Sequence, residues 1–288
     1  MDNWIEAARP KTLVAGIVPV IVGTAAAHTI ELWKFLGALA VSVSLQLAVN
    51  FANDYFDATK GVDSVDREGP RRMVSSGLIS ANRMRLASFI ALAVAAANGL
   101  LLASEVGWVI LIPGGLAIVA ALAYSGGPKP FGGSALGELF VFIFFGVVAT
   151  VGSAYVQIQE ITSLALAASV PVGMLASAIL LVNNLRDVET DYRAGKVTLV
   201  AVLGKEGSRT VFSLLVGLAL FDLVALALIA DSAWPLIALG AIPLSVRAMR
   251  LVLLRGDVRS LVKALAFTAR TEMVFGLLLT AGLWLAGS

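Results

Sequence analysis

The sequence predicts an all-α polytopic membrane protein, a bundle of about nine transmembrane helices, from its composition, its repeated apolar runs and its charge distribution. Of the 288 residues, 59% are hydrophobic and only 14% are charged, which is far more apolar than a soluble domain of this size. Apolar runs of about 20 residues, enough to cross a bilayer, recur from Thr12 to the end of the chain. We therefore expect a single transmembrane domain over residues 1–288.

The first apolar run follows Arg9, Pro10 and Lys11 directly and has no small-residue cleavage site behind it. A removable signal peptide would carry such a site, so this run is predicted to be a retained first span. The predicted helices cover residues 12–29, 35–57, 84–104, 107–124, 136–157, 162–187, 208–230, 232–254 and 264–286.

The positive charges predict the orientation of these helices. If the N-terminus is cytoplasmic, all of the 21 Lys and Arg residues except Lys34 fall on the cytoplasmic side. Positive charge is retained on that side during insertion, so we expect a cytoplasmic N-terminus, a C-terminus outside and an odd number of spans. The predicted outer connections are short, whereas the inner loops 58–83 and 188–207 are long and charged. The functional site is therefore expected at the cytoplasmic face.

Two similar acidic motifs end the second and sixth predicted helices, at residues 50–63 and 183–191. Each contains Asn-x-x-x-Asp, a spacing of one helical turn that places the amide and the carboxylate on one face. Further acids lie close by, and Asp187 and Asp191 repeat the same spacing. The two motifs are expected to face each other across one cavity.

Polar residues also extend from the first motif toward the middle of its helix, at Gln46, Asn50, Asn53 and Asp57. Such a stripe is costly against lipid, so it is expected to face the bundle interior or a water-filled cavity. Hydrogen bonding between helices and helix capping are the alternative explanation, but they would account for one Asn or Gln rather than for clustered acids.

The donor atoms of the two motifs favour a hard cation. The chain has no Cys and one His, and Mg²⁺ characteristically joins one or two carboxylates to substrate phosphates. Mg²⁺ held by two opposed clusters would neutralise a diphosphate leaving group, and Asp57 and Asp187 are predicted to be catalytic in this sense. The predicted metal ligands are Asn53, Asp54, Asp57, Asp63, Asn183, Asn184, Asp187 and Asp191.

Basic residues near the motifs are candidates for binding the diphosphate, because guanidinium and ammonium groups suit phosphate oxygens. The candidates are Lys60, Arg71, Arg72, Lys129 and Lys196, with Arg72 and Lys196 preferred for their motif positions. The same residues also fit a topology signal or contacts with anionic lipid, and both explanations stay open.

Motifs along nearly the whole chain resemble the UbiA superfamily of intramembrane aromatic prenyltransferases. They lie at residues 8–13, 53–63, 67–71, 124–128, 136–138, 142–146, 183–191, 194–196, 198–199 and 203–204. In the general superfamily pattern a second acid falls four residues after the acid at the position of Asp57, which is Gly61 in this chain. In this chain the acid is Asp63, two residues further on, and that displacement is typical of the naphthoate branch of the superfamily.

The resemblance implies an Mg²⁺-dependent transferase of the plasma (inner) membrane with a cytoplasmic active site. It would move an all-trans polyprenyl group from its diphosphate to 1,4-dihydroxy-2-naphthoate, releasing CO₂ and diphosphate and giving demethylmenaquinone for menaquinone biosynthesis. Arg9, Lys11 and Asn50 are candidates for binding the anionic acceptor, although Arg9 and Lys11 equally fit an interfacial anchor. We expect membrane lipid around the helices and no nucleic-acid partner; nothing in the sequence encodes an oligomeric state.

Two other functions remain as alternatives. One is prenyl transfer to another aromatic acceptor, such as 4-hydroxybenzoate. The other is ion-coupled transport, which would place acids near the midplane in symmetry-related broken helices rather than at one face. Outside the motifs, Asp222 is expected to join a structural ion-pair network with Arg247, Arg270 or Glu272, and His28 is expected to have no functional role.

Overall fold

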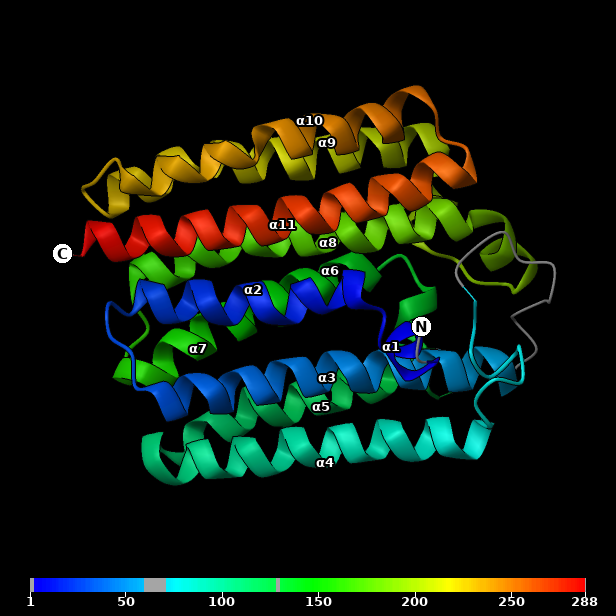
Figure 1. The fold of residues 1–288 in the computed structure, drawn as a ribbon, viewed down its shortest axis with the longest axis horizontal. Helices are drawn as coiled ribbons and strands as arrows, with labels where there is room; N and C mark the ends of the chain where they lie inside the picture. The colour runs from blue at the N-terminus through cyan, green and yellow to red at the C-terminus, as the bar shows by residue number, and fades with distance from the viewer. Residues whose placement is uncertain (1–2, 60–70, 128–129, 288) are drawn as a thin grey trace.

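The computed structural model describes residues 3–59, 71–127 and 130–287, and the described residues are almost entirely helical (Figure 1). A short helix α1 (Asn3–Ala8) precedes α2 (Pro10–Ala26), α3 (Leu32–Thr59) and α4 (Ala81–Val106). After η1 (Trp108–Ile110) and α5 (Leu111–Ser125), the turn η2 (Phe131–Gly133) leads to a continuous segment of α6 (Gly137–Val141), the π-helix η3 (Phe142–Val148) and α7 (Ala149–Ile158). The remaining elements are α8 (Ser163–Arg193), α9 (Leu199–Ile229), η4 (Trp234–Ala241), α10 (Ile242–Leu254) and α11 (Val258–Ala286).

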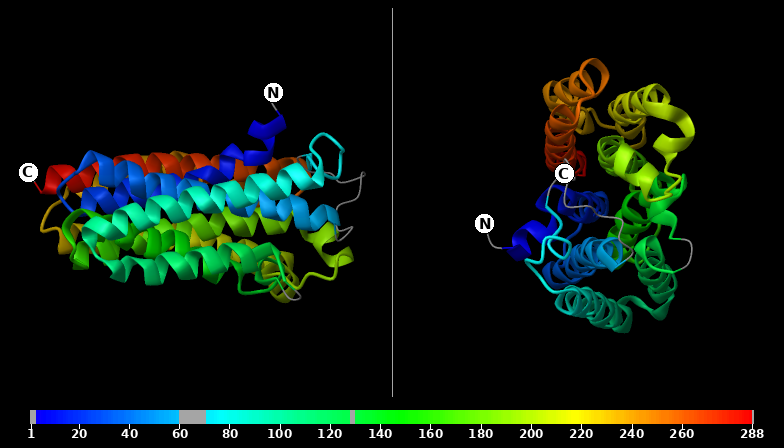
Figure 2. Two further views of the ribbon diagram at one scale, coloured as in Figure 1. Left: turned by 90° about the horizontal axis from the view of Figure 1, so that it is seen from below. Right: turned by 90° about the vertical axis from the view of Figure 1, so that its right-hand side faces the viewer.

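Nine apolar passes cross the bundle within these described ranges. Eight helical segments are long and apolar enough to span a membrane, and α2, with 17 residues, is a shorter apolar helix that makes the ninth pass. The passes run side by side and alternate in direction, so the chain ends at the end of the bundle opposite α1 (Figures 1 and 2). The predicted helical membrane bundle of about nine spans is confirmed. The orientation across the membrane stays a prediction.

The helix boundaries differ most from the prediction around the second inner loop. We expected residues 188–207 to form a long loop, but α8 continues to Arg193 and α9 begins at Leu199. The loop prediction was wrong because the acidic motif continues α8, and because a short helical stretch from Leu199 precedes the main part of α9, separated from it by a kink at Gly204 (φ 70°). α11 likewise starts at Val258, six residues before the predicted start, where Asp257 caps it by accepting a hydrogen bond from Ser260 N (2.9 Å).

The long helix α8 is the centre of the fold. It packs against α2, α7, α9, α11 and the π-helix, and most of its apolar residues are buried. Close contact with the π-helix depends on two glycines, because a Cβ built on Gly146 would lie 2.5 Å from Gly173 Cα. This packing fixes the second acidic motif, at the C-terminal end of α8, against the rest of the bundle.

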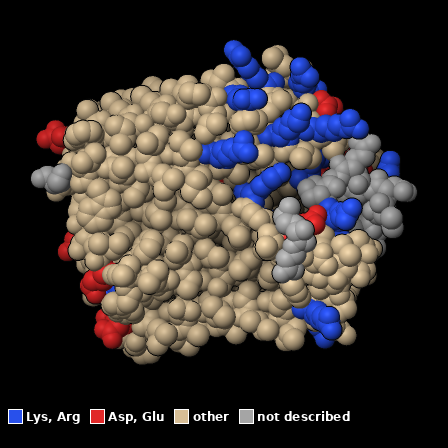
Figure 3. All heavy atoms as spheres, viewed as in Figure 1, with Lys and Arg blue, Asp and Glu red and all other residues tan. Residues whose placement is uncertain are grey.

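Positive charge collects at one end of the molecule (Figure 3). Both acidic motifs lie at that end, because α3 and α8 each finish there (Figure 1). Lys34 lies at the start of α3, at the other end, where its Nζ pairs with Glu31 Oε1 at 2.6 Å. The expected separation of Lys34 from the other basic residues is therefore present in the fold.

Candidate active site

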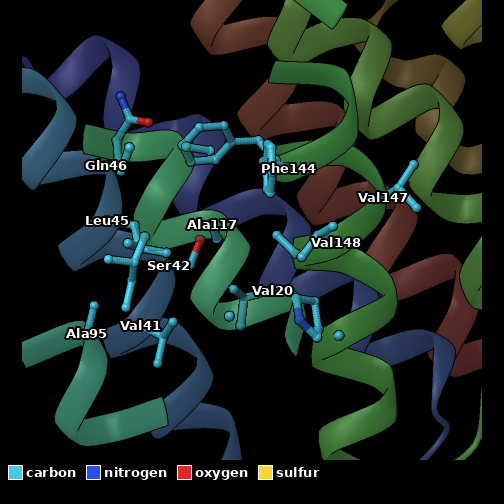
Figure 4. A pocket seen from close by; sticks show the side chains of 18 of the residues that line it. Val20, Val41, Ser42, Leu45, Gln46, Ala95, Ala117, Phe144, Val147 and Val148 are labelled. Atoms are coloured by element: carbon cyan, nitrogen blue, oxygen red, sulfur yellow. The ribbon is translucent and has the colours of Figure 1, made fainter. Parts of the chain in front are cut away.

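A cavity of about 850 Å³ lies between α2, α3, α4, α5, the α6–α7 segment and α8. Its lining on α3 runs from Ala38 to Asn53, a length of about 22 Å at the helical rise of 1.5 Å per residue. The lining is mostly apolar, and Figure 4 shows Ser42 and Gln46 among Val20, Leu45 and Val148. Polar side chains gather at the end of the cavity near the acidic motifs: Arg9, Asn50, Asn53, Tyr124 and Asn183.

The carboxylate of Asp57 is the centre of the first motif. Its oxygens pair with Arg72 Nη2 at 3.2 Å and with Lys196 Nζ at 3.3 Å. In the amide orientation that its neighbours require, Asn53 donates to Asp57 Oδ2 (2.8 Å) and accepts from Arg9 Nη1 (3.2 Å). Asn53 and Asp57 therefore act together, as their one-turn spacing predicts, and Arg72 joins them.

In the second motif, Asp187 is held by the residue before it. Arg186 forms a fork on the Asp187 carboxylate, with distances of 2.8 and 2.6 Å, and its Nη2 also donates to Asn183 Oδ1 at 2.8 Å. Bidentate guanidinium–carboxylate pairs of this kind combine strength with a fixed geometry. We missed Arg186 in the sequence because it counted as one positive charge among many. Its position inside the acidic motif was the available signal.

Lys196 joins the two motifs. Its Nζ lies 3.3 Å from Asp57 of α3 and 3.3 Å from Asp191 of α8. Burial disfavours the ammonium, but the attraction of the two carboxylates outweighs it and raises the pKa of Lys196. The side chain is therefore charged at neutral pH.

The backbone around Lys196 explains this position. Gly195 has a φ of 70°, which lets the chain turn sharply after α8, and Lys196 N donates to Asp191 O at 2.9 Å. Val197 N then donates to Gly133 O at 2.8 Å, which ties the loop to the turn η2. The preferred phosphate-binding candidates, Arg72 and Lys196, are thus both brought to Asp57.

Asp54 and Asn184 point to other partners. Asp54 accepts hydrogen bonds from the backbone N–H groups of Met73 (3.1 Å) and Val74 (3.3 Å), next to Arg72. Asn184 donates to Glu138 Oε1 at 2.9 Å. Both side chains are buried, and these contacts give them positioning functions; their metal-binding roles stay predictions.

Glu138 is a second residue to which the sequence assigned no role. It is buried, and its Oε2 has no hydrogen-bond partner in the part of the chain that the structure describes. Most buried polar atoms have a hydrogen-bond partner, so this oxygen makes Glu138 a further candidate residue of the site. The available signal was its place in the short motif of residues 136–138.

The three acceptor candidates separate in space. Arg9 and Asn50 line the cavity, whereas Lys11 is absent from the lining and its charge is repelled by Arg186 and Arg270. Asn50 Nδ2 donates to Ala8 O (2.8 Å) and Thr12 Oγ1 (3.0 Å), so it clamps the junction between α1 and α2. That junction holds Arg9, which adopts a positive φ of 52°.

The remaining candidates are exposed or lie outside the described residues. Arg71 is exposed, and Lys60, Asp63 and Lys129 belong to the residues that the structure leaves undescribed. Among described side chains, no three His, Cys, Asp or Glu residues come together as a ready-made metal cluster. The carboxylates of Asp57, Asp187 and Asp191 are instead paired with cations.

The network expected around Asp222 does not form among the described residues. Asp222 Oδ2 and both oxygens of Glu272 are buried without a hydrogen-bond partner, and Arg247 and Arg270 contact Phe267 instead. The expectation was wrong because depth in a helix does not determine which face a side chain occupies.

Comparisons with known proteins agree with this architecture. The model of the UbiA prenyltransferase family matches residues 16–286. The 1,4-dihydroxy-2-naphthoate octaprenyltransferase of Mycobacterium tuberculosis is 39% identical, covering 98% of this chain and 96% of the relative. The protein of the same name from Escherichia coli is 37% identical, covering 98% and 95%.

Solved structures share the fold at low identity. A UbiA homologue from Aeropyrum pernix superposes with a TM-score of 0.72 at 17% identity, covering 94% of this chain and 97% of that one. A UbiA homologue from Archaeoglobus fulgidus, bound to GPP and Mg²⁺, gives a TM-score of 0.69 at 15% identity, covering 96% and 99%.

Proposed function

The chain belongs to the UbiA prenyltransferase family, as its motifs predicted, and on that premise we propose that it prenylates 1,4-dihydroxy-2-naphthoate. The donor is an all-trans polyprenyl diphosphate, and the products are CO₂, diphosphate and demethylmenaquinol, the quinol form of demethylmenaquinone. The observation that carries the proposal is the cavity itself, a long apolar volume with charged and amide side chains at one end. Relatives named for the same acceptor, at 37% to 39% identity, support the choice of naphthoate.

The polar end of the cavity fits a diphosphate with its metal. Asp57, Asp187 and Asp191, with the amide oxygens of Asn53 and Asn183, offer the oxygen donors that Mg²⁺ prefers, and Asp63 is a further candidate outside the described residues. Mg²⁺ bound here would neutralise charge developing on the leaving diphosphate. When substrate binds, Arg72 and Lys196 would leave their ion pairs with Asp57 and bind phosphate oxygens instead.

The apolar part of the cavity suits the prenyl tail. An allylic cation formed as diphosphate leaves is destroyed by water, and the Val, Leu, Ile and Phe lining keeps water away from it. The only charged side chain among the described lining residues, Arg9, lies at the polar end, so that end is expected to hold the diphosphate end of the donor.

The naphthoate would approach from the polar end, where Arg9 supplies positive charge for its carboxylate. The ring carbon that bears the carboxylate attacks the allylic carbon as the C–O bond to diphosphate breaks. Loss of CO₂ then returns the electron pair of the breaking C–C bond to the ring and restores aromaticity. No strong protein base is needed for this sequence, which agrees with the pairing of Asp57, Asp187 and Asp191 with cations.

We place the site at the cytoplasmic face of the plasma membrane. The concentration of Lys and Arg at the same end of the bundle supports this orientation (Figure 3). A water-soluble acceptor and the diphosphate headgroup would then both reach the mouth from the cytoplasm.

The test of this function is a comparison of acceptors. The purified protein is reconstituted in liposomes with polyprenyl diphosphate and Mg²⁺, and given either 1,4-dihydroxy-2-naphthoate or 4-hydroxybenzoate. We expect a prenylated product from the naphthoate, which disappears when the metal is chelated. Faster prenylation of 4-hydroxybenzoate would reject the proposed acceptor while leaving the family assignment intact.

A further inference from the structure

Two arginines of the last helical hairpin contact one aromatic ring. The guanidinium carbon of Arg247, on α10, lies 4.6 Å from the centroid of the Phe267 ring, and that of Arg270, on α11, lies 5.3 Å from the same centroid. Both arginines are exposed on the surface of the bundle. The ring attracts each cation and orients its planar group, but the two cations repel each other.

No carboxylate of the described residues offsets this repulsion. Neither guanidinium forms an ion pair or a hydrogen bond with any of residues 3–59, 71–127 or 130–287. Residues 242–270 contain only one acid, Asp257, which caps α11. Lys11 adds to the local positive charge, because it is close enough to Arg270 for the two charges to repel. The two arginines therefore have no anionic partner among the described residues.

The position of the pair along the helices indicates where that anion would come from. Residues 234–246 carry no charge, and residues 271–286 carry only Glu272, which is fully buried. Counted from the end of the bundle opposite the acidic motifs, Arg247 and Arg270 are thus the first exposed charges that follow the apolar part of each helix. Leu277, two turns from Arg270 on the same face of α11, is 53% exposed and extends the apolar surface below the pair.

We propose that Arg247 and Arg270 bind the phosphate of an anionic phospholipid, with Phe267 holding the two guanidinium groups in place. Guanidinium forks match phosphate oxygens, and a phosphate between them would convert their repulsion into attraction. The acyl chains would lie along the exposed apolar face of α11. This site is on the outer surface of the α10–α11 hairpin, and neither arginine lines the cavity.

A lipid-binding measurement on the full-length protein tests the proposal. Delipidated wild-type protein is titrated with phosphatidylglycerol or phosphatidylcholine, and bound lipid is counted by native mass spectrometry. We expect a tightly retained phosphatidylglycerol and weaker retention of phosphatidylcholine. Equal retention of both lipids by the wild type would overturn the proposal, and this arm needs no variant to fold.

The variant arm separates the pair from general electrostatic attraction. In Arg247→Gln/Arg270→Gln we expect phosphatidylglycerol affinity to fall roughly thirtyfold, about 2 kcal/mol at 1.4 kcal/mol per tenfold. The matched control is Arg255→Gln/Arg259→Gln, which removes the same charge from exposed positions of the same hairpin that do not contact Phe267. An equal loss in the control would contradict a specific site.

Free phosphate distinguishes the source of the ligand. We expect inorganic phosphate, at concentrations matching the lipid, to leave phosphatidylglycerol binding unchanged, because it lacks the acyl chains that add apolar contact. Displacement of the lipid by inorganic phosphate would show a phosphate-ion site and would overturn the assignment to a phospholipid.

Discussion

At the level of single residues, the carboxylates of the two acidic motifs, near the polar end of the cavity, already have cationic partners. Asp57 pairs with Arg72 and Lys196, Asp187 with Arg186, and Asp191 with Lys196. Binding of metal and diphosphate would exchange these partners: the metal takes the carboxylates, and the phosphates take the freed cations. Without substrate, these cations neutralise the carboxylates. Substrate binding would break the ion pairs.

Asp57→Asn and Asp187→Asn test the role of the carboxylates in metal binding. Each substitution keeps the shape of the side chain but removes its charge, so we expect Mg²⁺-dependent turnover to fall by at least about a hundredfold. Glu189→Gln is the matched control, because Glu189 lies on α8 with Asp187, is largely exposed and pairs with Lys205. Turnover and Mg²⁺ titrations of purified, folded protein provide the measurement. Full activity in either Asp variant would eliminate the proposed metal role.

Lys196→Met tests the residue that links the two motifs. Loss of one charge-assisted contact to diphosphate, about 1.5–3 kcal/mol, should lower kcat/KM by roughly ten- to hundredfold, with a smaller loss in Lys196→Arg. A Met variant with wild-type kcat/KM would exclude Lys196 from donor binding.

The raised pKa of Lys196 adds a pH dependence. A group whose pKa is raised by folding stabilises the protein fully below its ordinary pKa, here 10.5, and loses that contribution as pH rises through the higher folded value. The difference in thermal stability between wild type and Lys196→Met should therefore be constant between about pH 7 and pH 9 and shrink only above that range. A difference that disappears near neutral pH would contradict a charged Lys196.

Much of this site was predictable from spacing alone. The Asn-x-x-x-Asp repeats placed Asn53 with Asp57 and Asn183 near Asp187, because one helical turn fixes which side chains are neighbours. Arg186 and Glu138 were not predictable in the same way. Their contacts depend on side-chain direction and on packing between distant helices, which a single sequence does not encode.

At the level of elements, the π-helix η3 is fixed by its contact with α8. A Cβ built on Gly173 would lie 2.8 Å from the Phe142 ring and 3.1 Å from Gly146 Cα, so neither glycine has room for a side chain. This contact aligns the α6–α7 segment, which lines the cavity, with the helix that carries the second acidic motif. Small residues at a membrane helix contact serve this purpose in general.

Gly146→Ala should therefore destabilise the protein. The added Cβ would lie 2.5 Å from Gly173 Cα and 3.0 Å from Gly173 N, which are backbone atoms that cannot rotate away. We expect a loss of about 1–3 kcal/mol and a lower melting temperature in detergent. Gly217→Ala, on α9 with no atom within 4 Å of its added Cβ, is the control and should be neutral or slightly stabilising. Equal melting temperatures for the two variants would contradict the close contact.

The spanning helices followed from apolar runs long enough to cross a bilayer, but their ends did not. Hydropathy locates the segment inside the membrane, whereas α8 and α9 continue beyond it through polar residues such as Asp191 and Lys205. The short helix α1 was missed because its six residues are too few to form an apolar run of that length. Caps and kinks, such as Asp257 and Gly204, determine these ends instead.

At the level of the whole molecule, positive charge and the candidate site lie at the same end of the bundle. Both acidic motifs, the mouth of the cavity and most of the basic residues occur there, while the apolar part of the cavity extends toward the other end (Figures 1 and 3). An odd number of passes then leaves the two termini at opposite ends. Under the proposed function, this arrangement would separate a headgroup site in contact with water from a tail site inside the membrane.

Cysteine labelling tests the orientation, and the chain is suited to it because it contains no Cys. Ser76→Cys lies at the end that carries the acidic motifs, and Ala233→Cys lies at the opposite end; both positions are exposed. In intact cells we expect a membrane-impermeant maleimide to label Ala233→Cys alone, and to label Ser76→Cys only after the membrane is opened. The reverse pattern would show a cytoplasmic C-terminus.

The most direct test of the central claim is the amount of CO₂ released for each prenylated product formed. The purified protein receives polyprenyl diphosphate, Mg²⁺ and naphthoate labelled in its carboxyl group, and labelled CO₂ and prenylated quinol are measured over the same time course. We predict equal amounts of the two, because the prenyl group replaces the carboxylate at the attacked ring carbon. A prenylated product that retains the label, with no CO₂ released, would contradict the account.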